Sequence, residues 1–309
     1  MMNSDQVVVY DYNNAKGSTE LDSAGMDRTV LTSRGGRSDS PQYAMNRSLR
    51  GLAVIIANVH FNKDPDNPSS VQLKDLPNVK YEADQLYSLF TALGYIVCIY
   101  PDVTSEQLIQ KSETYSRKNH SAYDSFICCI MSRGTAAHVY GSDGIAVSLQ
   151  EFIDNFTGCR SPTLHNKPKL FFIECFPGHK VRSEHVLNHR EWIHIAFTGY
   201  SLNSSCEVKL SRQLDTDSLQ TDDPDFLLAN CTYAGKTAPV NESTYMLHLC
   251  DDIKRRSRDT HDVLKIINDL HMELCHYGDS RSKICLSLKS TLKKLFVLKS
   301  SPQRACHGK

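Results

Sequence analysis

The stretch that decides the fold is Lys167-Pro-Lys-Leu-Phe-Phe-Ile-Glu-Cys-Phe-Pro-Gly178. Its apolar segment, Leu170 to Ile173, is typical of a buried strand in a sheet that is covered on both faces. An acid, a cysteine, a phenylalanine and a Pro-Gly turn follow the strand directly. Because functional residues in such sheets lie just beyond the carboxyl ends of the strands, we expect any chemistry between Glu174 and Gly178.

The same pattern of apolar strands and amphipathic helices extends on both sides of this stretch. Residues 51–57, 95–100 and 125–131 are further apolar runs of strand length, while 81–93 and 104–118 have apolar residues at helical spacing. Ser148, with Glu151 three residues later, is typical of a helix start. The alternation predicts an α/β fold with a mostly parallel central sheet covered by helices on both faces. Beyond the opening stretch we expect a short strand within 191–197 and an amphipathic helix over 251–275.

Composition excludes several classes of function. The 309 residues are 40% hydrophobic, which is enough for one large domain, and the formal net charge of +0 gives no electrostatic basis for binding nucleic acid or an anionic membrane. No apolar run approaches the roughly 20 residues that span a bilayer. The 11 cysteines have neither CxxC nor metal-site spacing, and the N-terminus lacks the apolar core of a signal peptide. We therefore expect reduced thiols in a cytoplasmic protein that uses no metal and no cofactor.

The opening stretch resembles the active-site strand of the caspases, in which Lys-Pro-Lys and an apolar strand lead into Gln-Ala-Cys-x-Gly. Arg50-Gly-Leu-Ala-Val-Ile-Ile56, Glu82-Ala-Asp-Gln-Leu86 and Asp225-Phe-Leu-Leu-Ala229 are similar to other family segments and follow in the same order. The resemblance covers about residues 50 to 298 and implies a caspase-like three-layer sandwich. It divides the chain into a disordered N-terminal arm (1–48), a large-subunit-like region (49–178), an intersubunit linker (179–223) and a small-subunit-like region (224–309).

The chain departs from the family at both catalytic positions that the resemblance implies. Ser132-Arg133-Gly134 stands where the family has Ser-His-Gly, and an arginine cannot relay a proton. Phe176 falls on the nucleophilic cysteine, and Cys175 lies one residue earlier. Because neighbouring side chains on a strand point to opposite faces, we expect Cys175 toward the core and Phe176 outward. We expect Arg133 to be solvated or ion-paired near Glu174.

The implied substrate pocket departs in the same way. The family binds an aspartate side chain with two arginines and a glutamine, a fork arrangement that suits a carboxylate. Here Glu174 stands on the glutamine, Val240 on the small-subunit arginine and Leu76 near the large-subunit arginine. An aspartate would meet a carboxylate and two apolar groups, so its desolvation would not be compensated.

The sequence therefore favours a catalytically inactive caspase homologue. Such a protein would regulate an active caspase, by activating or restraining it, in apoptosis. The partner would be that caspase in a heterodimer or a second copy of this chain, and Lys283 to Leu288 matches the family's dimer-forming edge strand. The candidate interface residues are Ile284, Cys285, Leu286, Ser287 and Leu288. Two alternatives stay open: a cysteine peptidase of altered mechanism that uses Cys175, and a decoy substrate or binding scaffold.

Three aspartates are candidate cleavage sites for other caspases. Asp217 precedes Ser218 in the linker and resembles the sites that separate the family's two subunits. Asp22 and Asp39 each precede a serine, and cleavage there would remove the N-terminal arm. The alternative is an acidic linker that is never cut.

Overall fold

The computed structural model describes residues 42–178, 193–196, 223–234, 244–257, 261–277 and 283–298. The candidate cleavage residues Asp22, Asp39 and Asp217 lie outside these ranges, as does Val240 of the implied pocket. The predictions made for these four residues therefore stay predictions.

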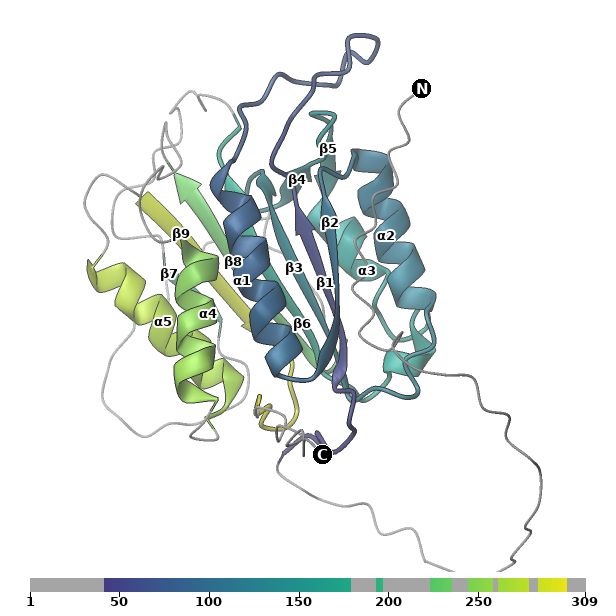
Figure 1. The fold of residues 1–309 in the computed structure, drawn as a ribbon, viewed down its shortest axis with the longest axis vertical. Coiled ribbons are helices and arrows are strands. Elements are labelled where there is room, and N and C mark those ends of the chain that lie inside the picture. Colours follow the sequence, from purple (N-terminus) through teal and green to yellow (C-terminus); the bar gives the residue numbers. More distant parts are fainter. Residues whose placement is uncertain are drawn as a thin grey trace, which may run out of the picture.

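A seven-stranded sheet, with the order β2-β1-β3-β6-β8-β9-β7, forms the centre of the described fold (Figure 1). Its neighbouring strands are parallel except for the antiparallel pair β8 and β9. The strands are β1 (Gly51–Ala57), β2 (Tyr95–Pro101), β3 (Ser125–Arg133), β6 (Lys169–Phe176), β7 (Ile193–Ala196), β8 (Phe226–Ala234) and β9 (Lys283–Ser290). The predicted mostly parallel sheet is confirmed.

Helices cover both faces of this sheet, which makes three layers (Figure 1). On one face, side chains such as Ile55 and Phe172 pack against α1 (Asn78–Ala92), α4 (Tyr245–Arg256) and α5 (Val263–Tyr277). On the other face, Val54 and Phe171 pack against α2 (Ser105–Arg117) and α3 (Leu149–Asp154). Alternate residues of one strand thus enter different cores, as the period of two requires. Three smaller elements complete the described fold: the hairpin of β4 (His138–Tyr140) and β5 (Ala146–Ser148), and the short 3-10 helix η1 (Pro162–Leu164).

Local sequence explains where several helices begin. Thr104 caps α2 through a reciprocal pair of hydrogen bonds with Gln107, and the Ser148 hydroxyl accepts from the Glu151 amide at the start of α3. The single amphipathic helix expected over 251–275 is wrong, because α4 ends near Ser257 and α5 begins at Val263. The Asp262 carboxylate accepts backbone hydrogen bonds in the first turn of α5, so it starts a new helix. None of the described helices is both long and apolar enough to cross a bilayer.

The expectation that Lys283 to Leu288 forms an open sheet edge is wrong for the second half of that segment. β8 pairs with one side of β9 along its whole length, and β7 pairs with the other side from Leu286 to Lys289. The predicted short strand within 191–197 is confirmed as β7, and it satisfies backbone groups that an edge would leave unpaired. Leu286 and Leu288 are buried in the core beside α4 and α5, whereas Ile284, Cys285 and Ser287 are partly exposed.

Candidate active-site region

The two positions that the resemblance matches to catalytic residues lie side by side at the carboxyl ends of β3 and β6. Arg133 is in register with Phe176, and the Gly134 amide donates to the Phe176 carbonyl oxygen at 2.8 Å. The parallel ladder thus brings together residues that are 43 positions apart in sequence (176 − 133).

Arg133 is a buried cross-link rather than a solvated side chain. The residue is 7% exposed, and its guanidinium donates to three backbone carbonyl oxygens: Nε to Lys74 at 2.8 Å, Nη1 to Pro177 at 2.9 Å and Nη2 to Asp75 at 3.2 Å. The expectation that it would be solvated or paired with Glu174 is wrong, because the side chain is buried and three of its five N–H donors bind these carbonyls. Burial lowers the pKa of Arg133, yet a guanidinium still carries its charge at neutral pH. Arg133 therefore ties the loop before α1 to the residue that follows β6.

Phe176 is also buried, at 2% exposure. Its ring stacks on Tyr233 of β8 with a centroid distance of 4.9 Å and an interplanar angle of 4°. The prediction that Cys175 and Phe176 point to opposite faces is confirmed, since they belong to the two different cores. The expectation that Phe176 points outward is wrong, because α1 and α4 cover that face of the sheet as well.

Cys175 is fully buried at 0% exposure. Burial and the neighbouring Glu174 charge raise the pKa of its thiol to about 12. Gly134 packs directly against it, since a Cβ atom there would come within 2.9 Å of the Cys175 sulfur. A nucleophilic cysteine needs access and a lowered pKa, and Cys175 has neither.

The described part of the implied substrate pocket is filled by core side chains. Leu76 is 4% exposed and packs in the same core as Phe176, while its amide donates to the Val59 carbonyl at 2.8 Å. Glu174 is 0% exposed, and its Oε1 accepts from the Tyr233 hydroxyl at 2.6 Å and from the Tyr245 amide at 3.0 Å. Burial raises the pKa of Glu174 well above its ordinary value, and a nearby second carboxyl, Glu82, adds to this effect.

Glu82 is the important residue that sequence reasoning missed. Glu82 lies on the α1 face that also carries Val79 and Leu86, at spacings of three and four residues. An acid on the apolar face of a helix is the signal that could have identified it, because such a side chain must enter the core.

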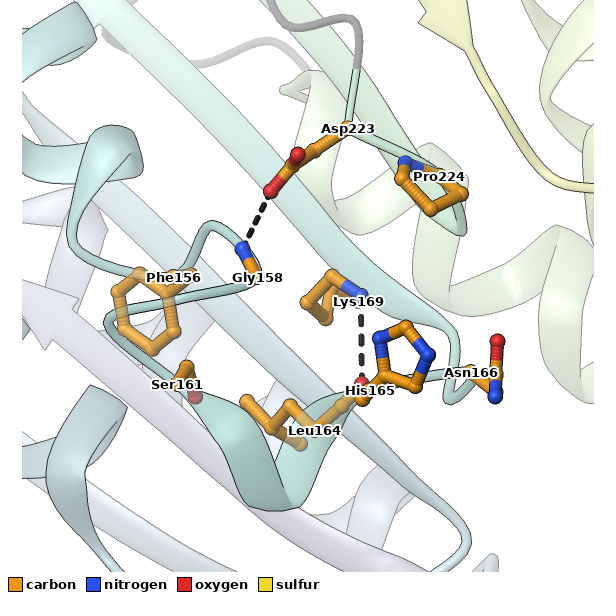
Figure 2. A pocket seen from close by; sticks show the side chains of 9 residues that line it. All are labelled: Phe156, Gly158, Ser161, Leu164, His165, Asn166, Lys169, Asp223 and Pro224. Carbon is orange, nitrogen blue, oxygen red and sulfur yellow. Dashed lines mark hydrogen bonds between the residues drawn. The ribbon is translucent and has the colours of Figure 1, made fainter.

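A cavity of about 110 Å³ lies at the opposite end of β6 (Figure 2). Its polar groups bind one another: the Asp223 carboxylate accepts from the Gly158 amide, and the Lys169 ammonium donates to the Leu164 carbonyl at 3.4 Å. Burial lowers the pKa of Lys169 to about 8. The lining residues are Phe156, Gly158, Ser161, Leu164, His165, Asn166, Lys169, Asp223 and Pro224. The contact between Asp223 and Gly158 holds the end of the linker against the large-subunit-like region, while the contact between Lys169 and Leu164 lies within that region.

Neither this cavity nor the β3 and β6 ends suggest a metal centre. Among the described residues, no three His, Cys, Asp or Glu side chains are arranged to hold a metal ion.

Together, the three layers, the order of the strands and the adjacent ends of β3 and β6 define a caspase-like domain. A family model described as Caspase domain matches residues 50–302, and the chain belongs to the caspase family.

Individual relatives agree with this assignment. Mouse Caspase-8 is 28% identical over 251 residues, which is 80% of this chain and 50% of the relative. Human Caspase-10 is 30% identical over 248 residues, which is 77% of this chain and 43% of the relative. The chain thus spans about half the length of these relatives. The solved structure titled "structure of pro-sf-caspase-1" shares the fold with a TM-score of 0.60 at 22% identity, covering 85% of this chain and 100% of the other.

Proposed function

We propose that this chain is a catalytically inactive caspase homologue that regulates an active caspase by pairing with it. The observation that carries the proposal is the burial of Arg133 and Phe176, which stand on the base and nucleophile positions of the family. Arg133 has its fork donors bound to backbone carbonyls, and Phe176 has no group that can attack a carbonyl. The family suggests apoptotic or inflammatory proteolysis as the process that is regulated.

The implied pocket supports the same proposal. Leu76 and Glu174 are core residues, so in the described part of the pocket an aspartate side chain would meet an apolar group and a second carboxyl. Activity through Cys175 is the second candidate, and the burial and raised pKa of that thiol oppose it. Restoring the family's catalytic histidine and cysteine would still leave the Glu174 carboxyl in the implied substrate pocket.

Hydrolysis of aspartyl peptides by the purified full chain tests the absence of catalysis. We expect no turnover above background from the wild type, from Cys175→Ala, or from the double variant Arg133→His with Phe176→Cys. Loss of one member of such a catalytic pair already lowers turnover by several orders of magnitude. Wild-type hydrolysis that disappears in Cys175→Ala would establish the altered peptidase instead.

Pairing is the active part of the proposed function, and β9 is the proposed surface. Because β7 pairs with β9 from Leu286 to Lys289, a partner strand can use this stretch only after replacing β7. Whether the partner is then activated or restrained depends on which of the partner's conformational states this chain binds more tightly. Because β7 lies within the linker, the linker would control access to the pairing edge of β9.

A useful variant must disturb pairing without disturbing the core. Leu286 is buried, so a charge there would test folding rather than pairing. Ser287 is partly exposed, so Ser287→Arg, with Ser287→Ala as its control, adds a charge on β9 without burying it in the core. We expect Ser287→Arg to weaken association with an active caspase domain at least tenfold, and replacement of residues 193–196 by Gly-Ser-Gly-Ser to strengthen it.

Association is measured by analytical ultracentrifugation, and the effect on the partner by its rate of peptide cleavage. If Ser287→Arg binds as the wild type does, pairing does not use β9. If the chain binds but leaves the partner's rate unchanged, it is a binding scaffold rather than a regulator.

A further inference from the structure

Two carboxyl side chains from different elements meet in the core. Glu82 of α1 and Glu174 of β6 are both 0% exposed. Oε1 of Glu174 accepts from the Tyr233 hydroxyl and from the Tyr245 amide. Oε2 of Glu174 and both oxygens of Glu82 accept no hydrogen bond from a fixed donor among the described residues. The two carboxyls are close enough to interact, since the charge of Glu82 helps to raise the pKa of Glu174, and the Thr244 hydroxyl lies beside Glu82.

The groups around this carboxyl pair supply no positive charge. β8 contributes Tyr233, α4 contributes Tyr245, and α5 contributes His271, which hydrogen bonds to the Tyr245 hydroxyl at 3.2 Å. Burial lowers the pKa of His271 to about 4, so it is neutral at physiological pH. The remaining titratable neighbours are thiols, namely Cys129, Cys175, Cys231 and Cys250. In the part of the chain that is described, neither carboxyl forms an ion pair with a lysine or an arginine, and Lys254 of α4 is exposed and donates to Gln85.

This environment favours one bound proton over two negative charges. Two buried carboxylates without a cation would repel each other, and each would lack hydration. If one carboxyl is protonated, it can donate to the other and so satisfy oxygens that have no fixed donor. The remaining charge can then be stabilised by the Tyr233 hydroxyl and the Tyr245 amide.

We propose that Glu82 and Glu174 form a proton-binding site that fastens the N-terminus of α4 to α1 and β6, and that loss of the proton loosens this contact. The proposal is independent of catalysis and of pairing. It depends on the glutamate at position 174, because a glutamine there could donate its amide to Glu82 at any pH.

The direction of the pH effect follows from the two carboxyls. Burial raises the pKa of Glu82 to about 7, and burial together with the charge of Glu82 raises the pKa of Glu174 well above its ordinary value. A raised folded-state pKa means that the folded chain binds protons more tightly than the unfolded chain does. The stabilisation is therefore complete below the ordinary glutamate pKa of about 4.3 and is lost as pH rises through 7.

The full-length chain and its variants Glu82→Gln, Glu174→Gln and the double variant test the proposal. Asp84→Asn is the matched control, because Asp84 is an exposed acid on the same helix with Lys80 as its partner. We expect hydrogen exchange of the amides at 245–250, corrected for intrinsic rates, to quicken by up to about tenfold per pH unit between pH 6 and 8. The control should behave as the wild type, while the double variant should show no pH-dependent change.

A second measurement needs no variant and so does not depend on how the variants fold. In the wild type with 13C-labelled glutamate carboxyls, NMR should show one or two carboxyl signals that titrate above pH 6. Titration of every glutamate in the ordinary range would overturn the proposal. The proposal is equally overturned if hydrogen exchange quickens in β1 and β2 as much as in α4. It is also overturned if replacing sodium by a bulky organic cation alters the pH dependence of exchange, since a metal cation would then occupy the site.

Discussion

Replacing Arg133 with alanine should destabilise the fold by about 3 to 5 kcal/mol, because it removes three hydrogen bonds from a charged group. The substitution removes a charged fork that donates to the carbonyls of Lys74, Asp75 and Pro177 at 2.8, 3.2 and 2.9 Å. Each hydrogen bond to a charged group contributes about 1.5 to 3 kcal/mol, but the three share one side chain and water can reach part of the site. The expected total is therefore smaller than the sum of three separate bonds.

Thermal unfolding followed by circular dichroism measures this effect. For a domain of this size, 1 kcal/mol corresponds to about 2 to 4 °C, so Arg133→Ala should lower the midpoint by roughly 6 to 20 °C. Arg133→Lys is the control, because it keeps the charge but can reach fewer of the three carbonyls, and it should fall between alanine and the wild type. A midpoint for Arg133→Ala within 2 °C of the wild type would mean that Arg133 is solvated and that its contacts are not structural.

Three further outcomes are expected. Phe176→Ala should cost about 3 to 5 kcal/mol in urea unfolding, because it leaves a cavity and removes the stack on Tyr233, whereas Phe176→Leu should cost less; equal stability of all three chains would contradict this. At pH 8 iodoacetamide should label exposed Cys159 quickly and leave Cys175 unmodified in the folded chain, and equal labelling of the two would show that the site is open. An active executioner caspase should cut the wild type in the linker and leave Asp217→Ala uncut there; identical fragments from both would exclude Asp217.

The central sheet could be predicted from sequence because its strands are covered on both faces. Continuous apolar runs at 51–57, 125–131 and 170–173 have no exposed face to carry polar residues, so each run identifies a strand by itself. The family resemblance then added the order of the elements. It also matched Arg133 and Phe176 to the catalytic positions of the family, which periodicity alone could not do.

The orientations at the site could not be predicted in the same way. Alternation along β6 correctly separated Cys175 from Phe176, but it does not say whether the second face is solvent or core. That depends on α4 and on Tyr233 of β8, which are distant in sequence. The carbonyl partners of Arg133 belong to irregular loops, and no residue type marks a free backbone carbonyl. The pairing of β7 with β9 also joins segments that are distant in sequence, so neither strand alone carries a signal for it.

The two degenerate positions are best understood as one change rather than two. An active site must hold its nucleophile and base exposed and imperfectly packed, which generally lowers stability. Here Arg133 has its fork donors bound by carbonyls and Phe176 is stacked in the core, so each now adds to the stability of the region where chemistry would occur. Arg133→His would remove the cross-link, and Phe176→Cys would leave a void beside Tyr233. Placing the family's histidine and cysteine at these two positions would therefore weaken the fold at both while Glu174 still occupied the pocket, so we expect the double variant to be less stable than the wild type and to gain no turnover of aspartyl peptides.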